Sequence, residues 1–275
     1  MQPFRPAQRA SRPHAAALLA AAAALLLAAC ATDRPDEFAG RSAEKLYAEA
    51  REELNAGSYE RAIKALERVE GRGAGTLLAQ QSQLDLAYAH WKANDRAQAL
   101  ATVDRFIKYN PSSPALDYAL YLRGVINFND NVGLFGSLSR QDLSERDQRA
   151  SRDAWQAFKQ LVDQFPASRY AADARLRMDY IVNSLAAYEV HVARYYYNRG
   201  AYVAAANRAQ QAVTDYQQSP AVEEALHIMA QSYAKLSLPE LREAAERVLR
   251  TNYPESRFIP GARSQAEARP WWRFW

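Results

Sequence analysis

The feature that most constrains the fold of this chain is a repeated sequence pattern that predicts two short amphipathic helices joined by a tight polar turn. In its first copy, apolar residues recur every three to four positions on both sides of Asn55-Ala56-Gly57. The second copy repeats this pattern around Asn94-Asp95, and Ala62 and Ala99 occupy equivalent places 37 residues apart. Because apolar residues at such spacing share one face of a helix, the pattern predicts stacked helical hairpins.

The spacing of these copies is near the roughly 34-residue period of tetratricopeptide repeats, so we predict an all-α tetratricopeptide-repeat solenoid of about five helix-turn-helix units. Ten glycines in 275 residues, and no alternating runs of β-branched residues, favour helices over strands. The third unit runs from Pro111 to Pro166 and exceeds one repeat by about 21 residues, which predicts an inserted loop at 129–146. We expect this loop either to bind a partner or to fold back on its own unit.

A long helical pattern from Ser168 to Asn198 is predicted to join two halves of the solenoid. We therefore expect N-terminal repeat units 1–3 at residues 42–166, C-terminal units 4–5 at 167–256 and a tail at 257–275. The tail ends in an aromatic cluster, Trp271 to Trp275, for which three roles fit. These roles are anchoring at a bilayer interface, docking on a partner and capping the final helix pair.

The start of the chain predicts export. Three arginines precede an uninterrupted run of Ala and Leu from Ala15 to Ala29, and Cys30, the only cysteine, follows the run. This is the layout of a secretory signal. The four residues that end in Cys30 resemble the lipobox of bacterial lipoproteins, which implies a lipoprotein signal peptide at 1–29. The alternative is a plain secretory signal followed by a coincidental cysteine.

The lipobox resemblance also implies where the mature chain resides. Cys30 would carry the lipid and begin a lipidated tether at 30–41. Ala31 stands where an aspartate would suggest retention in the inner membrane, so we expect a lipid anchor in the outer membrane. The repeats would then lie on its periplasmic face.

The remaining chemistry argues against several functional classes. Removing the three signal arginines reduces the 35 basic residues to 32 against 31 acidic ones, and no clustered basic element predicts nucleic-acid binding. His90, His191 and His227 lie on three different predicted helices, and none has a second ligand at metal-site spacing. We find no catalytic, metal or cofactor motif, and we expect no enzymatic activity.

Repeat solenoids instead offer a concave surface lined by the first helix of each unit. Aromatic residues with interspersed cations on that face would hold an extended peptide by its apolar side chains and carboxylates. Alternatively, these residues pack between units. The predicted groove residues are Tyr47, Arg51, Leu84, Tyr88, Lys92, Tyr121 and Val125.

Several long strings resemble the BamD family (also called ComL), the lipoproteins of the outer-membrane β-barrel assembly machinery. The resemblance runs from about Lys45 to Ser256. It is carried by Gln80-Gln81-Ser82-Gln83-Leu84-Asp85-Leu86, Asp104-Arg105-Phe106-Ile107, Pro114 to Gly124, and Tyr195-Tyr196-Tyr197-Asn198-Arg199-Gly200-Ala201-Tyr202-Val203-Ala204. Where several family members have an aromatic-Pro loop after the first unit, this chain has Arg72-Gly73-Ala74-Gly75.

The resemblance implies a non-enzymatic adaptor with several partners. Its N-terminal units would receive unfolded outer-membrane β-barrel proteins, and its C-terminal units would dock the periplasmic domain of BamA, with BamC and other assembly lipoproteins nearby. In the pair Asn207-Arg208, the arginine matches a family position that faces BamA, where its planar fork suits a carboxylate. We predict that reversal of Arg208 to glutamate weakens this contact while the fold survives. The alternative is an arginine that pairs within its own helix.

Two functions other than outer-membrane assembly also remain as alternatives. One is another lipidated tetratricopeptide-repeat adaptor, such as a pilotin or a regulator of a cell-wall enzyme, which would have a different partner. The other is a cell-wall lytic enzyme with a helical solenoid, which would need a catalytic domain that residues 257–275 do not supply.

Overall fold

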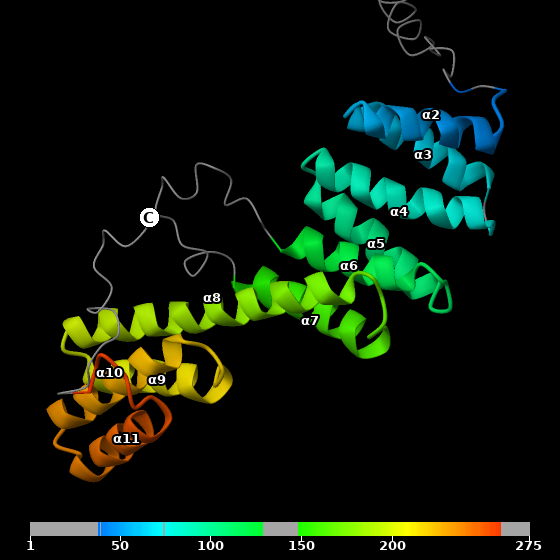
Figure 1. Ribbon diagram of the computed structural model, residues 1–275. Coiled ribbons are helices and arrows are strands. Elements are labelled where there is room, and N and C mark those ends of the chain that lie inside the picture. The colour runs from blue at the N-terminus through cyan, green and yellow to red at the C-terminus, as the bar shows by residue number, and fades with distance from the viewer. Residues whose placement is uncertain (1–37, 39, 74, 129–147, 260–275) are drawn as a thin grey trace, which may run out of the picture.

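The computed structural model describes residues 38, 40–73, 75–128 and 148–259, and the secondary structure of this part of the chain is helical throughout, with no strand (Figure 1). The predicted signal peptide at 1–29, the predicted lipidation site Cys30, the predicted loop at 129–146 and the aromatic residues 271–275 lie outside the described residues. No helix within the described ranges combines the length and the apolar content needed to cross a membrane.

The helices form consecutive antiparallel pairs, as the repeated sequence pattern predicts. Each helix packs against its neighbours in the chain, and the pairs stack into an elongated array (Figure 1). The helices are α2 (Ala43–Asn55), α3 (Tyr59–Arg72), α4 (Leu77–Lys92), α5 (Arg96–Tyr109), α6 (Leu116–Asn127), α7 (Gln148–Gln164), α8 (Ala171–Asn198), α9 (Tyr202–Asp215), α10 (Ala221–Lys235) and α11 (Pro239–Asn252).

Local sequence signals explain where several helices begin and how they are joined. The side chain of Ser42 accepts a hydrogen bond from the backbone N–H of Lys45, so it caps α2 as its position before the first apolar residue predicts. The turns after α2 and α8 each use a glycine with positive φ, Gly57 and Gly200, and the turn after α4 uses Asn94 in the same region. Glycine adopts this conformation without a steric penalty, and asparagine tolerates it better than most residues.

The connection between α3 and α4 begins later than the three glycines at 71, 73 and 75 would suggest. Gly71 lies inside α3, which continues to Arg72 and ends where the backbone N–H of Gly73 bonds the carbonyl of Val69. A single glycine costs a helix only about 1 kcal/mol relative to alanine. Val69, two residues before Gly71, is fully buried, and its packing favours continuation of α3 past the glycine.

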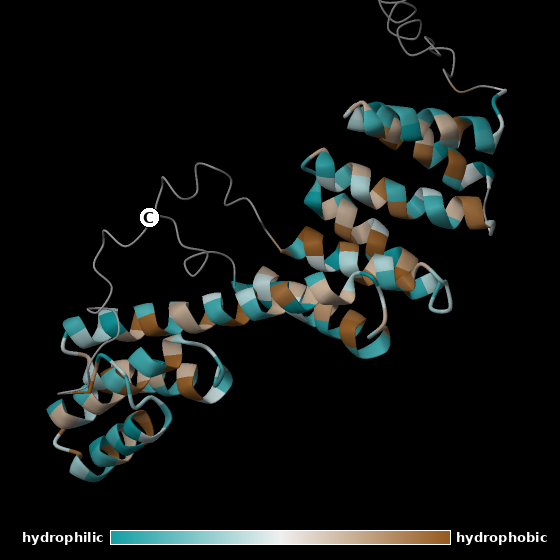
Figure 2. Cartoon of the chain, in the orientation of Figure 1, coloured by the Kyte–Doolittle hydropathy of each residue, from teal (hydrophilic) through white to brown (hydrophobic). Residues whose placement is uncertain are grey.

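Small residues allow the two helices of a unit to approach closely. Ala62 and Ala99 are fully buried at equivalent places, and Leu66 and Val103, four residues later, fill the space beside them. A close approach occurs at Gly124 of α6, where an added Cβ would lie 2.4 Å from the Phe158 ring of α7. Figure 2 shows apolar and polar residues distributed around each helix, as expected when one side packs and the other is solvated.

The long helix α8 connects the two parts of the array. Its first half contributes Ala174, Ile181 and Leu185 to a core shared with α6 and α7. Its second half contributes Val190 and Ala193 to a separate core shared with α9 and α10. The helix has 28 residues, which at about 1.5 Å per residue spans roughly 42 Å. It therefore serves both halves of the solenoid, as its sequence pattern predicts (Figure 1).

Candidate functional site

Half-buried tyrosines from the first helices of successive units lie close together and form what we call the aromatic stripe. It consists of Tyr47 on α2, Tyr88 on α4, Tyr118 and Tyr121 on α6, and Tyr170 just before α8. Tyr121 and Tyr170 are stacked with ring centroids 4.8 Å apart, and the Tyr118 and Tyr170 centroids are 5.5 Å apart. Burial raises the pKa of Tyr118 to about 12, and the nearby Asp85 carboxylate adds to this rise.

A buried carboxylate connects the first two units beneath the stripe. Asp85 of α4 is only 5% exposed, and its Oδ2 accepts a hydrogen bond of 2.8 Å from the hydroxyl of Tyr47 on α2. Arg51 Nη1 lies 3.4 Å from both carboxylate oxygens, and Gln81 Nε2 lies 3.4 Å from Oδ1. Burial and the hydrogen bond to Asp85 raise the pKa of Tyr47 above its ordinary value. These partners compensate a charge that would otherwise be costly to bury.

A similar arrangement recurs two units along the array, between α6 and α8. The Tyr121 hydroxyl donates to Asp173 Oδ2 at 2.7 Å, and Arg177 Nε donates to the same oxygen at 2.6 Å. Burial acts to raise the pKa of Asp173, but the hydrogen bonds from Arg177 and Tyr121 outweigh it, so the pKa is lowered. Burial and the bond to Asp173 raise the pKa of Tyr121. A tyrosine, a carboxylate and an arginine therefore link the first helices of neighbouring units twice.

Neither carboxylate is among the predicted groove residues, all of which are aromatic, aliphatic or cationic. A signal for Asp85 is present, because the residues from Ser82 to Ala87 are all buried in the structure and Asp85 is the one charged residue among them. A charged residue within an otherwise apolar or small stretch predicts a paired, buried carboxylate.

The structure places the predicted groove residues unequally. Tyr47, Tyr88 and Tyr121 belong to the aromatic stripe, and Val125 is half-buried against the core that contains Phe158. Leu84 is only 1% exposed and packs in the core between α4, α5 and α6, so its assignment to the groove surface is wrong. The physical reason is that α4 is covered by neighbours on several sides, which leaves little of it to face a groove.

Cations lie at the edges of the stripe. Lys92 is exposed, with its Nζ 5.0 Å from the ring centroid of Trp91 and 5.9 Å from that of Tyr88. The guanidinium of Arg169 lies 4.7 Å from the centroid of the Tyr170 ring, and Arg51 is exposed above Asp85. Aromatic faces bordered by cations suit a ligand that carries both apolar side chains and carboxylates.

The predicted partner-binding pair on α9 has an unexpected neighbour. Asn207 is exposed, whereas Arg208 donates from Nη1 to Oε2 of Glu189 on α8 at 3.0 Å. The side chain of Glu189 is 2% exposed and that of Arg208 is 41% exposed. Arg208 therefore pairs across helices rather than within its own, and part of its guanidinium still faces solvent. Because the pair includes a buried carboxylate, we expect charge reversal at Arg208 to destabilise the fold as well as any partner contact.

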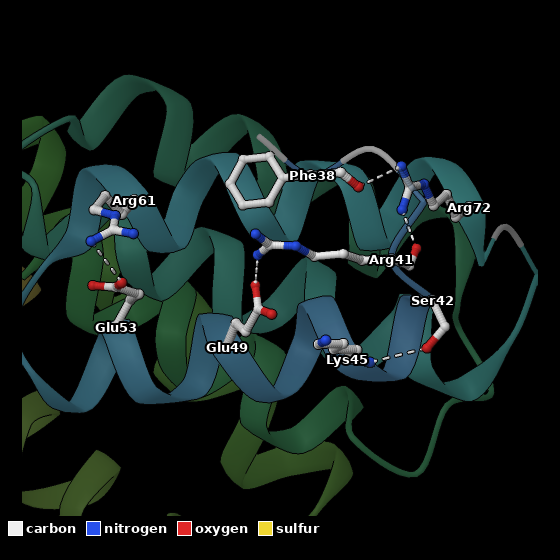
Figure 3. Close-up of polar contacts among 8 residues, drawn as sticks. All are labelled: Phe38, Arg41, Ser42, Lys45, Glu49, Glu53, Arg61 and Arg72. Atoms are coloured by element: carbon white, nitrogen blue, oxygen red, sulfur yellow. Dashed lines mark hydrogen bonds and ion pairs between the residues drawn. The ribbon is translucent and has the colours of Figure 1, made fainter. Parts of the chain in front are cut away.

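The N-terminal end of the solenoid is held against α3 (Figure 3). Arg72 donates from Nη2 to the backbone carbonyl of Phe38 at 3.1 Å and also hydrogen-bonds the carbonyl of Arg41. Arg41 in turn forms an ion pair with Glu49 of α2. These contacts fix the direction in which the chain enters the first helix, at the position where the predicted tether ends.

Comparison with known proteins shows which family and which relatives this chain is similar to. A family model described as YfiO, outer membrane lipoprotein, matches residues 40–248. The outer membrane protein assembly factor BamD of Neisseria meningitidis serogroup A is 49% identical over 234 residues, covering 85% of this chain and 87% of that protein. BamD of Vibrio cholerae is 34% identical over 218 residues, covering 79% and 90%. A solved structure of kinesin light chain TPR-like repeats from Podosopora anserina aligns at 17% identity and a TM-score of 0.34, covering 77% of this chain and 96% of that one.

Proposed function

Because the chain belongs to the YfiO family of outer membrane lipoproteins, we propose that it is a non-enzymatic adaptor in the assembly of outer membrane proteins. The observation that carries this proposal is the 49% identity to an assembly factor over 85% of the chain. A lipid on Cys30 would hold the solenoid at the periplasmic face of the outer membrane. The segment from Cys30 to Phe38 would reach at most about 28 Å at 3.5 Å per residue, so the first unit stays near the bilayer.

The N-terminal units would receive unfolded outer-membrane β-barrel proteins on the aromatic stripe. The rings of Tyr88, Tyr118 and Tyr170 offer apolar faces that are fixed in position by packing. Lys92 and Arg169 supply exposed positive charge at their edges. A strand of an unfolded barrel protein alternates apolar and polar side chains. One side of such a strand would contact the rings, and a carboxylate would meet a cation.

The C-terminal units would dock the periplasmic domain of BamA through Arg208 and Asn207, with BamC and other assembly lipoproteins bound nearby. Support for this comes from the exposed part of the Arg208 guanidinium and from the buried Glu189 that holds it in place. An arginine that is oriented in advance loses less side-chain entropy when it binds a carboxylate.

The experiment that tests the proposed function is co-purification of the tagged full-length chain from detergent-solubilised outer membranes. We expect a large β-barrel subunit to be recovered with it in stoichiometric amount. Recovery of a pilus component or a cell-wall enzyme in its place would favour the rival adaptor functions. The absence of any barrel subunit would refute the proposal.

Substrate binding by the stripe is tested separately with a fluorescent peptide that carries the C-terminal strand of an outer-membrane barrel protein. We expect Lys92→Glu to weaken binding about three- to tenfold, because it reverses a cation that lies over the rings of Tyr88 and Trp91. The matched control is Lys108→Glu, since Lys108 also lies over an aromatic ring, that of Tyr109 at 5.3 Å, but on α5, a second helix of its unit. Equal effects of the two variants would argue against the stripe.

A further inference from the structure

A cleft of about 770 Å³ lies at the junction of the two halves of the solenoid, apart from the aromatic stripe and from Arg208. We call it the junction cleft. It is lined from α7 by Trp155, from α8 by Met178, Asp179, Val182 and Asn183, and from the α9–α10 connection by residues 214–218 and 220. Its volume is within the range of sites that hold a ligand or a few side chains.

The floor of the junction cleft is apolar and fixed. Trp155, Met178 and Tyr216 are half-buried and pack against the core that contains Phe158 and Leu161. A surface of aromatic rings and a thioether favours aromatic ligands, because ring–ring and sulfur–ring contacts are both favourable.

The rim of the junction cleft is acidic. Asp179 and Asp215 are exposed, and neither carboxylate forms an ion pair with another residue in the described part of the chain. No lysine or arginine is among the lining residues, although Arg152 of α7 lies close to Tyr216. The cleft therefore fits an occupant that combines aromatic side chains with positive charge.

We propose that the occupant of the junction cleft is the C-terminal tail of this same chain, residues 269–275. This segment reads Arg-Pro-Trp-Trp-Arg-Phe-Trp and has three of the five tryptophans of the chain. Residues 260–275 contain three arginines and one glutamate, a net charge of +2. Another segment outside the described residues that has an apolar centre, residues 129–147, contains four acidic residues and two arginines, a net charge of −2. Charge complementarity with an acidic rim thus selects the tail.

The end of the described chain lies near the junction cleft. The hydroxyl of Ser256 donates to Glu223 at 2.6 Å, and Phe258 stacks on His227 with ring centroids 4.6 Å apart. Glu223 is three residues from Pro220, which lines the cleft, so the two are about 5 Å apart along α10. From Ile259 to Trp271 the chain spans up to about 40 Å. The tail can therefore reach the cleft without strain.

The docked tail braces the junction. Trp271 and Trp272 would pack on Trp155 and Met178, while Arg269 and Arg273 would pair with Asp179 and Asp215. One segment would then contact α7, α8 and the α9–α10 connection at once, which restrains bending between the two halves. The docking is intramolecular, so it is testable with the purified chain alone.

The test is photo-crosslinking within the full-length protein, purified in detergent, with benzoyl-phenylalanine in place of Trp272. We expect intramolecular crosslinks to the tryptic peptides that contain Met178, Val182 or Gln217. Crosslinks to residues 129–147, to the outer face of α11 around Leu241 and Val248, or to a second copy of the chain would overturn the proposal. Failure to crosslink to the protein at all would do the same.

Charge exchange makes the test specific. We expect Asp179→Lys with Asp215→Lys to reduce the crosslink yield about tenfold, and Arg269→Glu with Arg273→Glu to do the same. Combining the four substitutions should restore the yield. The matched control is Glu240→Lys with Glu243→Lys, two exposed acids of α11, which should have no effect. A loss of yield in that control instead would place the tail on α11 and overturn the assignment. Circular dichroism checks each fold, and the tail variants change residues beyond α11 only.

Discussion

Replacing Arg208 by alanine should destabilise the protein through the carboxylate that it leaves behind. The side chain of Glu189 is 2% exposed, and Arg208 Nη1 at 3.0 Å supplies its charge partner. Breaking a buried pair by removing one member costs roughly 3–5 kcal/mol. Because Arg208 itself is 41% exposed and its removal admits water to the carboxylate, we expect a loss of about 2–4 kcal/mol.

The assay is urea unfolding of the full-length chain followed by far-ultraviolet circular dichroism, with a double-mutant cycle as the control. Glu189→Gln removes the buried charge, so adding it to Arg208→Ala should recover more than half of the lost stability. A loss below about 0.5 kcal/mol for Arg208→Ala, which is typical of an ordinary surface substitution, would refute this account of the pair.

The same cycle decides how binding experiments at Arg208 are to be interpreted. Arg208→Glu places two carboxylates against each other, so reduced recovery of a partner could follow from a damaged α8–α9 interface alone. Arg208→Glu in the Glu189→Gln background removes that repulsion. We expect this double variant to be folded and still deficient in recovering the barrel subunit.

Three further predictions follow from packing and titration. Gly124→Ala should cost about 1–3 kcal/mol in urea unfolding, because the new methyl group would lie 2.4 Å from the Phe158 ring and force the helices apart. Burial raises the folded-state pKa of Tyr118 to about 12. The contribution of Tyr118 to stability is therefore complete below its unfolded pKa near 10 and is lost as pH rises toward 12. Tyr118→Phe should flatten this alkaline fall in the free energy of unfolding. Burial acts to raise the folded-state pKa of Asp173, but hydrogen bonds from Arg177 and Tyr121 lower it. The contribution of Asp173 to stability is therefore present above its unfolded pKa near 4 and is lost as pH falls through the lowered value. Asp173→Asn should flatten the acidic fall in the free energy of unfolding, and an unchanged fall would contradict the assignment.

The helical hairpins were predictable because each is encoded locally. Gly57 and Asn94 adopt the positive φ that their turns require, and Ser42 caps the helix that its position predicts. The equivalent burial of Ala62 and Ala99 was predictable for the same reason, since both follow from one repeated pattern. Spacing along one chain determines which residues share a helix face, and the repeat determines that such faces stack.

Which residues form the surface around the aromatic stripe was less predictable, because the exposure of each residue depends on how far its helix is covered by other helices. Leu84 and Tyr88 are one turn apart on α4 and look equivalent in the sequence, yet Leu84 is in the core and Tyr88 is half-buried on the stripe. Likewise, the Arg208–Glu189 pair joins two helices across a turn, and the sequence gives no distance between them. Pairs of this kind become visible only when the packing of α9 against α8 is known.

The paired carboxylates also limit which residues can report on binding. Asp85 and Asp173 are each compensated by one tyrosine and one arginine, so the inner face presents aromatic rings and cations to a ligand rather than free acid. Yet Tyr47 and Tyr121 hold neighbouring units together through these same bonds. A substitution at either would loosen the stacking of units as well as any ligand contact, since each leaves a carboxylate short of a partner. Lys92 makes no such inter-unit hydrogen bond within the described residues, so a loss of peptide affinity at Lys92 reports on the surface itself.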